Sequence, residues 1–168
     1  MSLGGGWHTH TLEASLLPVF RWFEASGIGI YGRKSAYFFP VIEVVHLLGL
    51  TLLLGAVLMI NLRLLGLVMN RHPVSDVVRA ARPLLWVGLA ATLASGTLLF
   101  LTEAVKCYYN VAFWYKMSFL IAAILFQLTA QRRLTAAPLP RTALRAIAAL
   151  SLLLWLGTGI AGRAIAFV

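Results

Sequence analysis

Two ionisable side chains, Glu43 and His46, interrupt an apolar stretch that runs from Tyr37 to Met69. They stand three positions apart, so a helix would place both on one face. A carboxylate and an imidazole are costly inside a membrane helix, and such groups usually pair with another polar group or serve a function. A histidine can ligate a metal ion or haem iron, and a neighbouring carboxylate can orient it. The pair therefore predicts either a polar contact that holds the bundle together, with Glu43 neutralising Lys116 or Arg163, or a haem or metal site within the membrane.

The composition agrees with a membrane location. The 168 residues are 61% hydrophobic and only 11% charged, with a mean hydropathy of +0.88. A soluble domain is about a quarter charged, so this chain has too little polar surface to enclose a water-soluble core. We therefore expect an all-α integral membrane protein.

Four stretches are long enough for transmembrane helices, which need about 20 apolar residues each. They cover residues 36–67, 84–102, 113–129 and 144–164. Residues 12–26 show helical periodicity but include charges and Pro18, which predicts an amphipathic helix lying at the interface. Residues 1–11, with His8 and His10, are expected to lack regular structure, and the glycine-rich residues 27–32 to form a turn. The expected architecture is a tail and interfacial helix (1–35), then a bundle of four transmembrane helices (36–168).

Arginines gather beside two of the connections and contribute most of the net charge of +9. The positive-inside rule then places loops 70–83 and 132–143 in the cytoplasm and both termini outside, in the periplasm of a Gram-negative cell. This orientation predicts a multi-pass protein of the bacterial inner membrane. Anionic lipid headgroups are the expected partners of the arginines, whereas no basic stripe interleaved with aromatics indicates nucleic acid.

The same topology brings the polar groups of different spans to one level. His46 and Glu43 would lie in the outer third of the bilayer, with Lys116 and Arg163 at similar depth on other helices. His46 is then a possible axial ligand of haem, Lys116 or Met117 a possible second ligand, and Arg163 a possible partner of the propionates. A closed zinc site is not expected, because no span supplies matching histidines or cysteines.

Two motifs carry a resemblance to known families. His46-Leu47-Leu48-Gly49 with Gly55 resembles the first-helix pattern of the CopD copper-resistance family and of HemJ-type protoporphyrinogen oxidases, and residues 110–116 resemble their lysine-bearing helix. The whole chain is similar to a family of small bacterial membrane proteins, a domain of unknown function, through Trp22-Phe23-Glu24-Ala25-Ser26 and residues 162–166. The HemJ-type resemblance implies haem b associated with His46 and Lys116.

Three functions remain open on these grounds. The leading hypothesis is a small redox or electron-transfer protein that binds haem b through His46 and Lys116, with Arg163 near the propionates. The second is a CopD-like copper or metal transporter in which His46 and Glu43 are ligands. The third is a structural or accessory subunit without a cofactor, as a homo-oligomer or in a larger membrane complex, whose polar groups only lock the bundle. Whether the protein is an enzyme is left open.

Overall fold

The computed structural model describes residues 7–136, 138–165 and 167. Within these residues every regular element is a helix, which confirms the all-α class. The seven helices are α1 (Trp7–Glu24), α2 (Gly27–Lys34), α3 (Phe38–Leu65), α4 (Val74–Thr102), α5 (Ala104–Tyr109), α6 (Val111–Ala136) and α7 (Arg141–Ala164).

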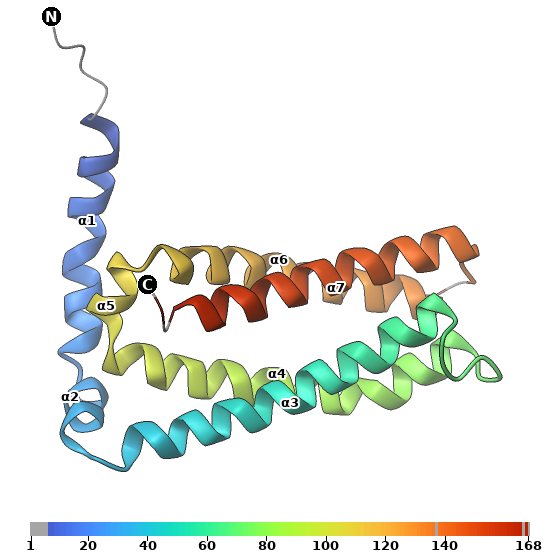
Figure 1. Cartoon of the computed structure of the whole chain (residues 1–168), viewed down its shortest axis with the longest axis horizontal. Coiled ribbons are helices and arrows are strands. Elements are labelled where there is room, and N and C mark those ends of the chain that lie inside the picture. The colour runs from blue at the N-terminus through green and yellow to red at the C-terminus, as the bar shows by residue number, and fades with distance from the viewer. Residues whose placement is uncertain (1–6, 137, 166, 168) are drawn as a thin grey trace, which may run out of the picture.

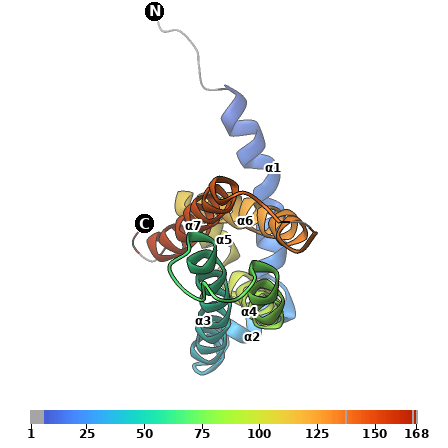
Figure 2. The ribbon, with the colours of Figure 1, turned by 90° about the vertical axis from the view of Figure 1, so that its right-hand side faces the viewer.

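Four of these helices, α3, α4, α6 and α7, are long and apolar enough to cross a membrane, as expected. They form two antiparallel hairpins, with α3 packed along α4 and α6 packed along α7 (Figure 1). The hairpins contact one another through α3 with α7 and through α4 with α6. Viewed from the end where the hairpin loops lie, the four helices form a bundle with each hairpin on its own side (Figure 2).

The bundle has a narrow core and an apolar exterior. Leu53, Leu85, Ala123 and Ala148 are fully buried at the centre, with Trp155 beside them. Many large apolar side chains are instead exposed along the same helices, among them Leu48, Leu58, Leu125, Leu153 and Leu156. A helix that is apolar on all sides is typical of a membrane span, because lipid covers the face that the protein does not.

Glycines let α3 and α4 approach closely. A Cβ atom added to Gly88 would lie 2.5 Å from the backbone nitrogen of Leu53, and one added to Gly49 would lie 2.8 Å from the Thr92 hydroxyl. Real Cβ atoms essentially never come this near, so neither position accepts a side chain without moving a helix. Small residues on α4 thus allow α3 to approach closely.

The three remaining helices cap the end of the bundle opposite the hairpin loops. Helix α1 runs roughly perpendicular to the bundle there, the direction expected of a helix lying on a membrane surface (Figure 1). Glu24 at its end accepts a hydrogen bond from the backbone of Val105 at 2.7 Å and pairs with Arg33 at 3.3 Å. Phe20 packs against Phe100 and Tyr108 at centroid distances of 5.5 and 5.2 Å, which joins α1 to α4 and α5.

Two predictions about the N-terminal region are wrong. Helix α1 begins at Trp7, so residues 7–11 are helical, whereas residues 1–6 lie outside the described residues. Residues 27–34 form helix α2 instead of a turn, because Ser26 caps it by accepting from the Gly29 backbone. Gly29 and Gly32 are used for close packing against Leu101 and Thr102, which explains glycines inside a helix.

The span limits also need correction, chiefly at the loop end. Helix α4 begins at Val74, so Pro83 lies inside it and the loop is shorter than residues 70–83. Val77, Val78 and Ala81 are buried in that extension, and this packing compensates for the interruption at the proline. Helices α6 and α7 likewise extend past the apolar stretches into arginine-bearing turns. Helix α3 is shorter than residues 36–67, ending at Leu65 before Gly66 in a left-handed conformation.

Candidate functional site

His46 lies on the cap-side half of α3 and is held against α4. Its Nδ1 atom is 3.0 Å from the hydroxyl oxygen of Ser95. That hydroxyl donates its own proton to the carbonyl of Ala91 at 2.5 Å, so it accepts from the imidazole. With the hydroxyl proton on Ala91, this contact places the ring N–H on the α4 side and the proton of the neutral ring on Nδ1.

This arrangement leaves Nε2 as the unprotonated nitrogen of the neutral ring. A histidine whose Nδ1–H is held by a fixed acceptor presents its Nε2 lone pair in a defined direction, as metal- and haem-ligating histidines do. Gly96 makes room for the ring, since a Cβ atom there would lie 3.1 Å from His46 Cε1. Ser95 and Gly96 thus orient His46 from the neighbouring helix.

Lys116 enters the bundle from α6, near the cap. Its side chain is half-buried and lies along Gly162 of α7, whose added Cβ atom would be 3.6 Å from Nζ. Within the described chain Lys116 forms no ion pair and no hydrogen bond. An unpaired ammonium at membrane depth is costly, so the position calls for an anionic or electron-donating partner.

The electrostatics bring His46 and Lys116 into one site. The charge of Lys116 acts on the His46 imidazole, although α3 and α6 do not pack directly against each other. His46 and Lys116 thus lie within electrostatic range of each other, and their convergence on a shared ligand stays a prediction.

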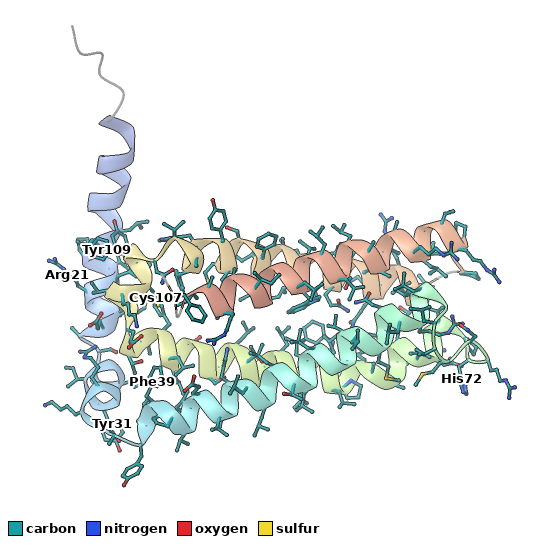
Figure 3. All side chains as sticks on the ribbon, in the orientation of Figure 1. Arg21, Tyr31, Phe39, His72, Cys107 and Tyr109 are labelled. Atoms are coloured by element: carbon teal, nitrogen blue, oxygen red, sulfur yellow. The ribbon has the colours of Figure 1, made fainter. Side chains whose placement is uncertain are left out.

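Glu43 and Arg163 make fewer contacts at the site around His46 than their positions in the sequence suggested. Glu43 is exposed, and its charge acts on His46, but it makes no hydrogen bond or ion pair among the described residues. Arg163 is also exposed and stacks over the ring of Phe167, 4.5 Å from its centroid. Across the described ranges, no three His, Cys, Asp or Glu side chains are grouped to hold a metal ion. His8, His10 and His72 lie in α1 and in the α3–α4 loop (Figure 3 labels His72).

Cys107, labelled in Figure 3, lies in the cap close to this site. Burial, assisted by the negative charge of Glu103, raises the pKa of its thiol to about 11. The thiol is therefore protonated at neutral pH and is a poor nucleophile and a poor metal ligand. Its location near Lys116 does not add a thiolate to the site.

Ser95 is the site residue that the sequence pattern did not reveal. The sequence pattern indicated Glu43 as the group expected to orient His46. A Ser-Gly pair on a neighbouring span is a usable signal only when the register between two helices is known, since many membrane helices carry such pairs for packing alone.

Comparison with known proteins places the chain in a family. Residues 19–168 match DUF6644, described as a family of unknown function. The chain belongs to this family. No curated protein and no solved structure matches it. The matched range includes all four long helices and the end of α1, so His46, Ser95 and Lys116 lie within the family's domain.

Proposed function

We propose that this DUF6644 protein is a small redox-active membrane protein that binds haem b, with His46 as an axial ligand and a role in membrane electron transfer. The observation that carries the proposal is the hydrogen bond from His46 Nδ1–H to Ser95, whose own proton is committed to Ala91. It leaves Nε2 free as a ligand of fixed direction.

The residues around His46 are compatible with haem. Gly96 and Gly162 let the imidazole and the lysine side chain pack against α4 and α7, since added Cβ atoms would lie 3.1 Å from His46 Cε1 and 3.5 Å from Lys116 Cε. Lys116 would either supply the second ligand or neutralise a propionate. Arg163, exposed at the end of α7, would pair with the other propionate. When bound, the haem supplies one-electron chemistry, while Ser95 holds the proton of the ligand at Nδ1.

An absorption spectrum tests the proposal most simply. The protein is expressed with ample haem, purified in detergent and scanned before and after dithionite. We expect a Soret band that shifts on reduction, and its loss in His46→Ala. His72→Ala is the matched control, because His72 has an exposed side chain in the α3–α4 loop. A protein without a Soret band, or an unchanged band in His46→Ala, would refute haem ligation by His46.

A structural role is the second candidate, and a specific contact favours it. Asn61 of α3 is 1% exposed and donates to the Ser151 hydroxyl of α7 at 3.0 Å. Polar links between membrane helices of this kind can serve stability alone. If His46–Ser95 is such a link, His46→Ala and Lys116→Ala will lower the unfolding temperature without removing any cofactor. The copper alternative rests on the CopD-like motif alone.

The proposed membrane orientation follows from charge. The loops at the end opposite the cap would face the cytoplasm, and the cap with His46 would face the periplasm of the bacterial inner membrane. Electron exchange would then take place on the periplasmic side. Reporter fusions to the α3–α4 loop and to the C-terminus test this, and a periplasmic α3–α4 loop would contradict it.

A further inference from the structure

A hollow lies between α4 and α6 at the hairpin-loop end of the bundle, far from His46. Figure 2 views the molecule from this end. The hollow has a volume of about 150 Å³. This is smaller than the roughly 300–1,000 Å³ of small-molecule pockets and suits a compact group. Three basic, two apolar and one amide side chain define it: Arg79, Arg82, Arg132, Trp86, Leu128 and Gln131.

The hollow carries uncompensated positive charge. Arg79 is paired with Asp76 at 2.9 Å, but in the described part of the chain neither Arg82 nor Arg132 forms an ion pair. The surroundings do not neutralise them, because Asp76 is the single acidic residue within 63–82 and 132–145, where eight arginines stand. Two guanidinium groups from separate helices thus flank one small space.

Gln131 gives an independent indication of a ligand. The residue is only 8% exposed, and its amide nitrogen Nε2 is buried with no hydrogen-bond partner. A buried donor without an acceptor costs about 1–3 kcal/mol, so such groups are uncommon in folded proteins. Gln131 lines the hollow, so a rotation of its side chain would bring the amide nitrogen to an acceptor placed there.

We propose that this hollow binds the phosphate group of an anionic phospholipid. Phosphate oxygens would accept from Gln131 and pair with Arg82 and Arg132, as guanidinium groups do in two-point contacts with phosphate. Trp86 and Leu128 would contact the glycerol and upper acyl region, and exposed Leu125 continues the apolar surface one turn deeper. A basic hollow between membrane helices with an apolar lower wall fits a lipid headgroup better than a free anion.

The test measures lipid binding to the detergent-purified full chain. Dioleoyl phosphatidylglycerol and dioleoyl phosphatidylcholine are titrated separately, with bound lipid counted by native mass spectrometry. We expect one phosphatidylglycerol to bind preferentially. In the double variant R82Q/R132Q its affinity should fall about 10- to 30-fold, since each arginine near a lipid surface contributes about 1 kcal/mol.

A charge-matched double variant, R141Q/R145Q, is the control. Both of its arginines are exposed on the first turns of α7 at the same end of the bundle, and neither lines the hollow. It should keep the preferential site with less than a twofold change. Equal losses in the two double variants would mean that only diffuse positive charge attracts the lipid, and the proposed site would be overturned.

Two further measurements cover the remaining outcomes. Gln131→Met preserves the charge and approximate size of the side chain, so it can be tested even if the arginine variant does not fold. A several-fold lower affinity of Gln131→Met for phosphatidylglycerol supports the site. An unchanged affinity overturns the role of the amide. Inorganic phosphate at millimolar concentration should neither bind nor compete with the lipid. If phosphate alone occupies the site and displaces phosphatidylglycerol, the assignment to a lipid is wrong.

Discussion

The close contact between α3 and α4 leads to a quantitative prediction for Gly88→Ala. The new Cβ atom would lie 2.5 Å from the Leu53 backbone nitrogen, about 0.9 Å short of the 3.4 Å of ordinary contact. Backbone atoms cannot turn aside, so the helices must separate by a similar amount. The 3.0 Å contact between His46 and Ser95 joins the same two helices, and that shift would lengthen it to about 3.9 Å, beyond hydrogen-bond range.

A variant at a second glycine separates the effect of the clash on the free energy of unfolding from the intrinsic effect of replacing glycine with alanine. Overpacking of this kind costs about 1–3 kcal/mol. Alanine also gains intrinsic helix stability of up to about 1 kcal/mol over glycine. Gly55→Ala on α3 has the same gain without the clash, because nothing lies within 4 Å of its added Cβ atom. The difference in the free energy of unfolding between the two variants should therefore be about 1–3 kcal/mol, with Gly88→Ala the less stable.

Reversible unfolding in mixed micelles, followed by circular dichroism, measures this difference. Gly159→Ala on α7 is a further control, since its added Cβ atom also meets nothing within 4 Å. Because the clash also loosens the contact of His46 with α4, Gly88→Ala should weaken haem binding, whereas both control variants should retain it. Equal stability of Gly88→Ala and Gly55→Ala would show that α3 and α4 do not pack through glycine at this point.

Three other perturbations have definite expected results. Ser95→Ala should lower haem affinity, measured by haem titration, about 10- to 100-fold, because it removes the acceptor of the ligand's N–H. Thr97→Ala is the control and should leave the affinity unchanged, since the Thr97 hydroxyl is exposed and bonds within α4 to Leu93. The Cys107 thiol, with a pKa of about 11, should react slowly with a maleimide at pH 7, and the rate should rise about tenfold per pH unit up to about pH 10. Denaturation in sodium dodecyl sulfate should restore the ordinary reactivity of a cysteine thiol. Reaction at pH 7 as fast in the folded as in the denatured protein would contradict its burial. Glu24→Ala removes the acceptor for the first turn of α5 and should make the cap more susceptible to trypsin, while Asp76→Asn, which breaks only an exposed pair, should not.

The sequence predicts the transmembrane architecture well, because hydrophobic length is a strong signal that packing does not alter. All four spans are present as helices. The ends of the spans were less predictable. Helix α4 includes Pro83 and begins at Val74, because buried residues such as Val77 stabilise the turns before the proline. Helix α2 was missed because glycine favours turns locally, whereas here Gly29 permits close packing against α4.

For the site, the sequence indicates which polar residues enter the membrane but not which of them meet. The topology placed His46 and Lys116 on the cap-side halves of their spans, and the charge of Lys116 reaches His46 there. The partner of His46 depends on helix register, a rotation of one residue being about 100° around a helix. That rotation decides between Glu43 on the same helix and Ser95 on the next, and no local pattern specifies it.

The central claim is that Nε2 of His46 ligates haem, and chemical rescue tests it most directly. Haemin is titrated into the purified wild-type protein and into His46→Gly, with and without added imidazole, and the Soret band is recorded. We expect wild type to bind one haem per chain, His46→Gly to bind none, and imidazole to restore binding by occupying the vacated ligand position. Haem binding by His46→Gly equal to that of wild type, without imidazole, would contradict the claim.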